Sequence, residues 1–320
     1  MLPMRSLSDL GEHELITRIA KLAGSKKSAG VVLGIGDDAA VLRPRASEDW
    51  VTSTDVAVED VHFQWSTQSA RHIGRRALIA NLSDLAAMGA RPMGCLLALS
   101  APAELPVSRF EGLMKGLLSE AVTHACPLIG GNLARSRDTT LAITVFGTVP
   151  RGRALRRDGL RAGDGLYVTG TLGGAALALA RSERSGSALR FLPTPRLVAG
   201  QKLARLEGMG GCIDVSDGLL PDLQQMLRAS RVGAELDVAA IPRPKGFESA
   251  CRGLEIDPQA LSLAGGEDYE LLFSLRSSLA SRMSAPALSR RLGVQVTKVG
   301  TVRSRPGVDG APSLAGFRHY

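Results

Sequence analysis

The chain has 320 residues, of which 44% are hydrophobic, with 39 basic and 31 acidic side chains. At about 150 residues per domain, this length predicts two domains with substantial hydrophobic cores, which excludes a disordered chain. The longest nearly apolar run, 93–103, is far shorter than the ~20 residues of a membrane helix, and residues 1–5 lack a hydrophobic signal segment. We therefore expect a cytoplasmic protein without a membrane span. The four cysteines are too widely spaced for a CxxC metal site and are expected to be buried apolar residues.

The net charge of +8 lies entirely in the second half of the chain. Residues 1–150 hold 15 basic and 15 acidic residues, whereas 151–320 hold 24 and 16. Five arginines lie within 151–161, where Asp158 alone opposes them. Because only 4% of the residues are aromatic, few rings are available to stack on bases, and the cluster suits a polyphosphate better than a nucleic-acid strand. The alternative is a solvated arginine-rich loop without a ligand.

Strand-like and helical stretches alternate through the first half. Apolar residues at helical spacing predict helices, and short β-branched or apolar runs predict strands. The segment 150–164 is rich in arginine and glycine and has no periodicity, so we place a domain boundary there. In chain order, we expect a helix at 12–23, strands at 31–33 and 50–58, a helix at 70–88, a strand at 93–100, a helix at 109–123 and strands at 128–131 and 139–149.

The second half shows the same alternation. A glycine-rich turn at 170–174 follows its first strand, and the run 212–218 leads directly into a helix. The pattern predicts a mixed fold, α/β or α+β, in two domains, 1–150 and 151–320. We expect a strand at 165–169, helices at 175–180, 196–207 and 219–230, and strands at 234–238, 269–275 and 294–302.

Most nucleotide-binding motifs are absent from the sequence. It has no GxxxxGK[ST] loop, no protein-kinase motif set and no GxSxG elbow. Residues 34–39 match the GxGxxA turn of dinucleotide-binding folds, but Asp37 and Asp38 occupy positions where a pyrophosphate would lie. Pro44 also interrupts any following helix, so an isolated dinucleotide-binding turn is disfavoured.

Carboxylates recur beside Gly, Ser, Thr or Asn in segments that we interpret as ordered turns. Two ionised carboxylates ~4 Å apart repel by about 4 kcal/mol at an effective dielectric of ~20, so converging acids need a cation. A donor set of Asp, Ser and Thr oxygens, without a Cys or His pair, favours Mg²⁺ bound together with substrate phosphates. The segments are Gly36-Asp37-Asp38, Ser53-Thr54-Asp55, Asn81-Leu82-Ser83-Asp84, Asp214-Val215-Ser216-Asp217-Gly218 and Gly265-Gly266-Glu267-Asp268.

Each acidic segment also has a purely structural explanation. Asp beside Gly is common in turns, and Asp55 or Asp84 alone could cap a helix or a loop. His62 could be an ordinary packed or surface histidine, and Glu267 a turn residue. In 214–217, two acids on a tight turn precede a helix whose N-terminal amides could receive phosphate.

The ordered motifs resemble the thiamine-monophosphate kinase family over nearly the whole chain. The specific blocks are Asn-Leu-Ser-Asp-Leu-Ala-Ala-Met-Gly-Ala at 81–90 and Gly-Gly-Glu-Asp-Tyr-Glu-Leu at 265–271. Ser-Thr-Asp at 53–55, Ile-Gly-Gly at 129–131, Gly-Arg-Ala-Leu-Arg-Arg at 152–157 and Ile-Asp-Val-Ser-Asp-Gly-Leu at 213–219 accompany them. Gly-Ile-Gly-Asp-Asp at 34–38 is shared more widely within the aminoimidazole-ribonucleotide-synthetase-like superfamily.

The resemblance implies the two-domain fold of that superfamily, of the α+β type, with the N-terminal domains of two chains paired in a homodimer. It implies an N-terminal domain for ATP, Mg²⁺ and dimerisation, and a C-terminal domain that completes the active-site cleft. The implied reaction is direct in-line transfer of the γ-phosphoryl group of ATP to thiamine monophosphate, the last step of thiamine diphosphate biosynthesis. No protein base is required, because the acceptor phosphate is already ionised.

The resemblance also implies residue roles, and no nucleic-acid or membrane partner is expected. His62 and Glu267 would bind thiamine monophosphate. Gly131, Asn132, Arg157 and Ser216 would bind ATP. Several Mg²⁺ ions would be held by Asp38, Ser53, Thr54, Asp55, Asp84, Asn132, Asp214 and Asp217.

The sequence departs from the family pattern at two places. Asn132 stands where the family commonly has Asp, so an amide oxygen replaces one expected carboxylate and removes a negative charge. Leu314 aligns with the tryptophan expected against thiamine, and Phe317 or Tyr320 is the candidate replacement. The alternatives are another ATP-using member of the superfamily, such as an aminoimidazole ribonucleotide synthetase or a selenide kinase, and a non-catalytic nucleotide- or RNA-binding protein.

Overall fold

The computed structural model describes residues 6–10, 12–24, 30–33, 35 and 40–312. Their contacts divide the chain into two compact units. Unit 1 comprises 1–85, 91–148 and 186–192, and unit 2 comprises 86–90, 149–185 and 193–320. Within the described ranges, no helix is both long enough and apolar enough to cross a membrane.

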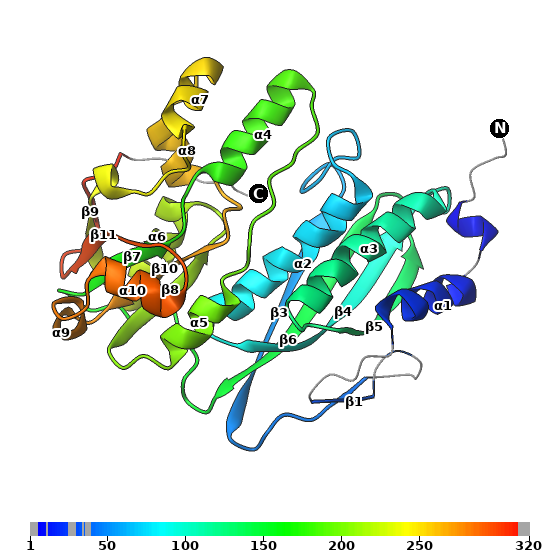
Figure 1. Cartoon of the computed structure of the whole chain (residues 1–320), viewed down its shortest axis with the longest axis horizontal. Coiled ribbons are helices and arrows are strands. Elements are labelled where there is room, and N and C mark those ends of the chain that lie inside the picture. Colours follow the sequence, from blue (N-terminus) through cyan, green and yellow to red (C-terminus); the bar gives the residue numbers. More distant parts are fainter. Residues whose placement is uncertain (1–5, 11, 25–29, 34, 36–39, 313–320) are drawn as a thin grey trace. The chain divides into compact units, whose positions relative to one another are not determined.

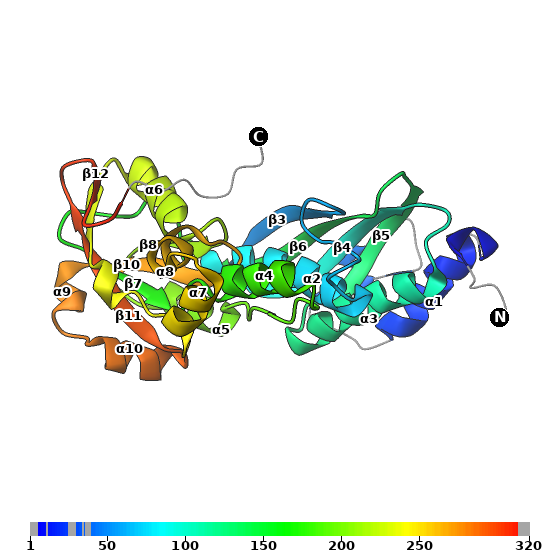
Figure 2. The ribbon, with the colours of Figure 1, turned by 90° about the horizontal axis from the view of Figure 1, so that it is seen from above.

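Unit 1 is a four-stranded sheet with two long helices on one face (Figures 1 and 2). The strand order is β3-β6-β4-β5, in which β4 runs antiparallel to β6 and parallel to β5. Leu78 and Leu82 of one helix and Phe110 of the other are fully buried against the sheet side of the unit. The elements are η1 (Leu7–Asp9), α1 (Glu12–Ala23), β1 (Val31–Leu33), β2 (Val41–Leu42), β3 (Glu48–Val58), α2 (Ala70–Ala87), β4 (Arg91–Ala101), α3 (Val107–Thr123), β5 (Leu128–Arg135) and β6 (Thr140–Pro150).

Unit 2 is a six-stranded sheet of order β12-β9-β11-β7-β10-β8, with α6 and α10 on opposite faces (Figure 2). Its main core joins α6 to strands β7, β9, β10 and β11 and to the edge strand β8. The strands are β7 (Gly165–Thr169), β8 (Met209–Val215), β9 (Gly233–Leu236), β10 (Glu270–Leu275), β11 (Val296–Arg303) and β12 (Gly307–Asp309). The helices are α4 (Gly174–Ser185), α5 (Leu197–Ala204), α6 (Leu219–Ser230), η2 (Val238–Ala240), α7 (Phe247–Leu254), α8 (Pro258–Ala264), α9 (Ser277–Ala280) and α10 (Ala285–Leu292).

The predicted mixed α and β fold is confirmed, and each of the predicted helices and strands is present, some with the predicted ends and others with ends shifted by a few residues. The sequence interpretation missed the α-helices α7, α8, α9 and α10 of unit 2 and the short 3-10 helix η2. It also described the acids near positions 55, 84 and 214 as turn residues, which is wrong. Asp55 lies in strand β3, Asp84 in the last turn of α2 and Asp214 in strand β8.

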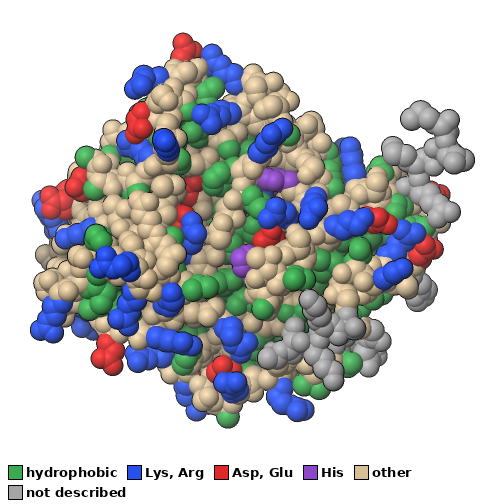
Figure 3. Space-filling view, in the orientation of Figure 1, with side chains coloured by type: hydrophobic (Ala, Val, Ile, Leu, Met, Phe, Trp, Pro, Cys, Tyr) green, Lys and Arg blue, Asp and Glu red, His purple; other side chains and the backbone are tan. Residues whose placement is uncertain are grey.

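The arginine-rich segment 151–161 is tied into unit 2. Its Leu155 and Leu160 are buried, and its five arginines are exposed. The backbone N–H of Cys212 on β8 donates to the carbonyl of Arg156 at 2.9 Å. On the face of the molecule shown in Figure 3, basic side chains are scattered with acidic ones among them.

Candidate functional site

In unit 1, strand β3 presents two predicted metal ligands toward α2. The hydroxyl of Ser53 donates to Oδ2 of Asp84 at 2.5 Å, and the N–H of Asp55 donates to Oδ1 of Asn81 at 3.1 Å. The Asn81 amide is itself fixed, since its Nδ2 donates to the carbonyl of Ala77 at 2.9 Å. Because side chains alternate along a strand, Ser53 and Asp55 share the face on which Asp84 lies.

Thr54 faces the other way. Its hydroxyl donates to the carbonyl of Ile143 on β6 at 3.0 Å and accepts from the hydroxyl of Thr144 at 3.1 Å. These contacts hold the middle of β3 against β6. The side chain of Thr54 therefore does not join those of Ser53 and Asp55, although it was predicted in the same ligand set.

Asn132 lies on the edge strand β5, opposite Ala98 of β4, and its side chain is exposed. Gly131 precedes it at a very close approach between the two strands, since a Cβ atom there would lie 2.0 Å from the carbonyl oxygen of Leu97. Strands β5 and β3 form opposite edges of the sheet, three strand spacings or about 14 Å apart. Within one chain, Asn132 is therefore not brought to Asp55.

His62 follows β3 in a short aromatic loop. Its Nδ1 accepts a hydrogen bond from the N–H of Val58 at 3.2 Å, which fixes the orientation of the ring. Phe63 is buried and packs edge-on against Trp65, and the guanidinium of Arg109 lies 4.8 Å from the centroid of the Trp65 ring. The backbone of Val58 therefore orients the His62 ring, in a loop that the neighbouring Phe63 anchors.

In unit 2, a buried carboxylate holds the turn that contains Ser216 and Asp217. Asp222 in the first turn of α6 accepts both of their backbone N–H groups on Oδ2, each at 3.0 Å. Burial raises the pKa of Asp222 to about 7, and the charge of Asp217 adds to this rise while the backbone N–H groups oppose it. Asp222 therefore already occupies the N–H groups of Ser216 and Asp217, which come before the N-terminal amides of α6 itself.

The 265–270 segment packs directly on that turn. The N–H of Glu267 donates to the carbonyl of Ser216 at 2.7 Å, and the N–H of Tyr269 donates to the carbonyl of Val215 at 2.9 Å. A Cβ atom at Gly266 would lie 2.3 Å from the Ser216 oxygen, so only glycine fits this approach. Glu267 and Tyr269 have φ angles of 66° and 52°, which cost roughly 1–2 kcal/mol each for residues with a side chain. Such strain is commonly found at functional sites.

Two further acids of this segment, Asp268 and Glu270, are buried anchors that sequence reasoning missed. Asp268 accepts the N–H groups of Gly173 and Ala175 at the start of α4, at 2.5 and 3.0 Å. Burial raises the pKa of Asp268 to about 7, opposed by these N–H groups and reinforced by the charge of Glu270. Glu267 and Tyr269 are half-buried, so in this segment the buried acids that hold the loop alternate with side chains that are partly exposed to solvent.

Glu270, which belongs to the predicted motif 265–271, forms a buried ion pair with Arg196. Arg196 donates to both of its oxygens, at 2.6 and 2.5 Å, and the hydroxyl of Thr169 donates to Oε2 at 2.6 Å. The Glu270 side chain is 6% exposed and that of Arg196 is 24% exposed. This pair fixes the start of β10, directly after Glu267 and Tyr269.

Arg157, predicted to bind ATP, has a neutral partner. Its Nη1 donates to Oε1 of Gln225 on α6 at 2.9 Å. The neighbouring Arg156 instead donates twice to Asp158, at 2.8 and 2.6 Å. Of these two arginines, Arg156 is neutralised by a carboxylate, whereas the Gln225 contact leaves the positive charge of Arg157 uncompensated.

The predicted ligands Ser53, Asp55 and Asp84 carry only oxygen donors, which fit Mg²⁺ better than softer metals, and the structure brings the side chains of Ser53 and Asp84 together. Among the described residues, no three His, Cys, Asp or Glu side chains gather closely enough to hold a metal ion. The predicted ligand Asp38 lies outside the described residues, as do Leu314, Phe317 and Tyr320 at the C-terminus.

Asn132→Asp should lower the Mg²⁺ concentration needed for half-maximal activity, by about tenfold, because the number of ligand charges tunes affinity for hard cations. The measurement is a Mg²⁺ titration of the initial rate for both proteins. Ala134→Asp adds the same charge on the same exposed face of β5 and should leave the titration unchanged. A titration curve that does not move in Asn132→Asp would show that position 132 does not bind the metal.

Comparisons with known proteins match the N-terminal and the C-terminal parts of the chain to the same family. Residues 36–149 match the family described as AIR synthase related protein, N-terminal domain, and residues 161–310 match its C-terminal domain. A thiamine-monophosphate kinase of Synechococcus elongatus is 37% identical over 99% of this chain and 98% of its own length.

Solved structures give the same result. The crystal structure of thiamine-monophosphate kinase from Stenotrophomonas maltophilia K279a superposes with a TM-score of 0.80 at 37% identity, covering 92% of this chain and 95% of that one. The protein AaThiL, solved in complex with AMPPCP and TMP, superposes with a TM-score of 0.75 at 27% identity over the full length of both chains. With both domain models matched and this identity over almost the whole sequence, the chain belongs to the thiamine-monophosphate kinase family of AIR synthase related proteins.

Proposed function

We propose that this chain catalyses the ATP-dependent phosphorylation of thiamine monophosphate to thiamine diphosphate, with ADP as the second product. The observation that carries the proposal is the full-length similarity to a relative solved with AMPPCP and TMP, together with 37% identity to a thiamine-monophosphate kinase over 99% of the chain. Because ATP is the donor, the proposed reaction takes place in the cytoplasm, as the last step of thiamine diphosphate synthesis.

The chemistry requires positioning and charge neutralisation more than covalent catalysis. When bound, Mg²⁺ would neutralise phosphate charge and help to align donor and acceptor oxygens. In unit 1, the carboxylates of Asp55 and Asp84 and the hydroxyl of Ser53 would hold metal, with Asp38 as a further ligand. Thr54, whose side chain faces β6, would contribute through its backbone, and Asn132 would contribute from a second copy of the chain. In unit 2, Asp214 and Asp217 would do the same. Gly131, Asn132, Arg157 and Ser216 would bind ATP, and His62 and Glu267 would bind thiamine monophosphate.

The proposed active form is a homodimer built from unit 1. The edge strand β3 exposes two large apolar side chains, Trp50 at 45% and Val56 at 44%. An exposed edge of this kind is a surface for pairing with another chain. If β5 of a second copy lies along β3, Asn132 of that copy comes near Asp55. Within a single chain the two residues are at opposite edges of the sheet.

Purified protein incubated with ATP, Mg²⁺ and thiamine monophosphate should yield thiamine diphosphate and an equal amount of ADP. Unphosphorylated thiamine should yield neither product, since it lacks the phosphate acceptor, and a chelator of divalent cations should stop the reaction. Chromatographic quantification of both products checks this result. Binding of ATP without any thiamine diphosphate would overturn the proposal, and ADP formation independent of thiamine monophosphate would favour another member of the superfamily.

A further inference from the structure

The buried carboxylate Asp222 and the exposed arginine Arg157 are linked through one side chain, Gln225. Nη1 of Arg157 donates to Oε1 of Gln225 at 2.9 Å. Nε2 of Gln225 donates in turn to Oδ1 of Asp222 at 3.1 Å. The other oxygen of Asp222 accepts the N–H groups of Ser216 and Asp217. A continuous chain of hydrogen bonds thus runs from the arginine to the backbone of the turn.

The groups at the two ends of this series of hydrogen bonds determine which of the groups between them donate and which accept. A guanidinium and two backbone N–H groups are donors only, so the group between them must accept at both ends. Asp222 accepts at both oxygens, and Gln225 accepts from Arg157 while donating to Asp222. A reversed Gln225 amide would turn its NH₂ group toward the guanidinium and its oxygen toward the carboxylate, and would lose both contacts. The amide therefore has one satisfied orientation.

Burial and backbone contacts make the link rigid. Asp222 is 1% exposed, and its side chain cannot move without leaving two backbone donors unpaired. The hydroxyl of Ser230 at the end of α6 donates to the carbonyl of Arg157 at 3.3 Å and accepts the N–H of Leu160 at 3.1 Å. Helix α6 therefore holds Arg157 by its side chain at Gln225 and by its backbone at Ser230.

We propose that Asp222 and Gln225 are positioning residues for ATP, which hold the Arg157 guanidinium and the Ser216–Asp217 turn in one fixed arrangement. This inference rests on the proposed function, because Arg157 and Ser216 are the proposed ATP contacts of unit 2. A neutral amide suits this task, since it orients the guanidinium and leaves its full positive charge for a phosphate. Neither residue touches the reacting atoms.

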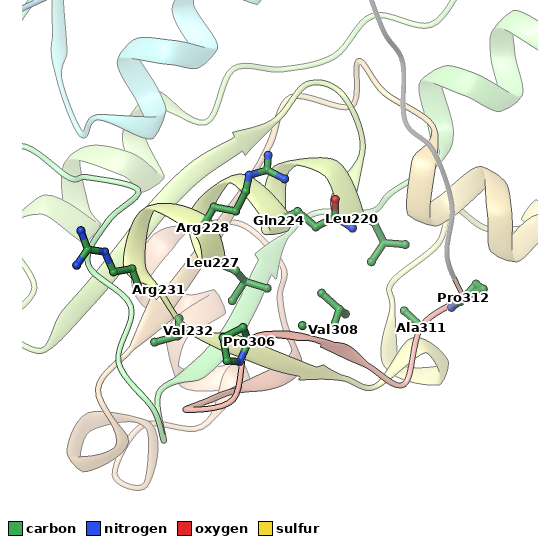
Figure 4. A pocket seen from close by; sticks show the side chains of 11 residues that line it. Leu220, Gln224, Leu227, Arg228, Arg231, Val232, Pro306, Val308, Ala311 and Pro312 are labelled. Carbon is green, nitrogen blue, oxygen red and sulfur yellow. The ribbon is translucent and has the colours of Figure 1, made fainter.

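The test compares two identical substitutions one residue apart on α6. Gln225→Met keeps the length of the side chain and removes both hydrogen bonds. Gln224→Met is the matched control, because Gln224 is exposed and lines a separate groove of about 440 Å³ between α6 and β12 (Figure 4). Of the two, the hydrogen bond that orients Arg157 is the one expected to affect ATP; its loss, about 1 kcal/mol, should raise the KM for ATP about fivefold in Gln225→Met, with kcat and the KM for thiamine monophosphate unchanged. Gln224→Met should match the wild type.

A second substitution separates the two contacts of Gln225. In Gln225→Glu, the carboxylate still accepts from Arg157 but cannot donate to Asp222 and repels it, so the KM for ATP should also rise. The proposal is overturned if both variants have the KM of Gln224→Met, or if kcat and both KM values change together with the midpoint of thermal unfolding. A wild-type protein that forms no thiamine diphosphate would instead refute the proposed function, so the two failures are distinguishable.

Discussion

Asp84→Asn should reduce the rate of thiamine diphosphate formation by about 10²- to 10³-fold and leave the fold intact. Two unit charges about 4 Å apart interact by about 4 kcal/mol at an effective dielectric of about 20, which corresponds to roughly a thousandfold in rate. In the wild type, the hydroxyl of Ser53 donates a hydrogen bond to Asp84 at 2.5 Å. The side-chain oxygen of the asparagine can accept the same hydrogen bond, so the local structure should be preserved. Initial rates at saturating ATP and thiamine monophosphate measure the effect.

The control for this variant is Asp138→Asn, which removes the same charge from an exposed position in unit 1. It should retain wild-type activity, because Asp138 is not in the proposed ligand set. Partial recovery of Asp84→Asn at high Mg²⁺ would agree with a role in metal binding. Loss of thermal stability in proportion to the loss of activity would contradict that role, and would make Asp84 a structural partner of Ser53.

Arg196→Met should lower the free energy of unfolding of the protein by about 3–5 kcal/mol, because it leaves the buried carboxylate of Glu270 without its cation. Glu270 would retain only the hydroxyl of Thr169, at 2.6 Å. Arg196→Lys keeps a positive charge but loses the two-pronged geometry, so it should fall between the methionine variant and the wild type. Urea unfolding followed by circular dichroism gives all three values.

The matched comparison is Arg303→Met in the same unit. Arg303 contacts two carboxylates, Glu235 and Asp309, but its side chain is 46% exposed and theirs are 54% and 69% exposed. Exposed ion pairs are worth at most about 1 kcal/mol, so this variant should be close to the wild type in stability. Equal destabilisation by Arg303→Met and Arg196→Met would show that burial of Glu270 does not govern the effect.

The local elements of the fold were largely predictable from the sequence. The helix 219–230 is confirmed at both ends, because Gly218 precedes it and the chain turns left-handed at Arg231 after it. Signals for the missed helices were present as well. At α8, Asp257 caps the backbone N–H groups of Gln259 and Ala260, with Pro258 in the first turn, which is a common helix start.

The division of tasks among the acids was not predictable in this way. Glu267 and Asp268 are neighbours in one motif, yet only Asp268 is fully buried. Its partner Gly173 lies 95 positions away, and Thr169 lies 101 positions from Glu270. Asp222 likewise belongs to no predicted ligand set, since its role depends on how the turn folds back over α6. The family resemblance identified the motifs, but only the packing of the folded chain shows which acids in them are buried and hold the backbone and which are partly exposed.

Given the proposed role of Glu267 in binding the acceptor, the alternation in residues 267–270 has a consequence for how acceptor specificity can change. Asp268 and Glu270 hold the loop, so altering either one disturbs α4 or the start of β10. Glu267 and Tyr269 hold the neighbouring turn through their backbone N–H groups, which every residue except proline retains. Evolution toward a different phosphorylated acceptor could therefore exchange the side chains at positions 267 and 269 while Asp268 and Glu270 keep the loop in place. The new residues would have to tolerate a left-handed backbone conformation, as asparagine does.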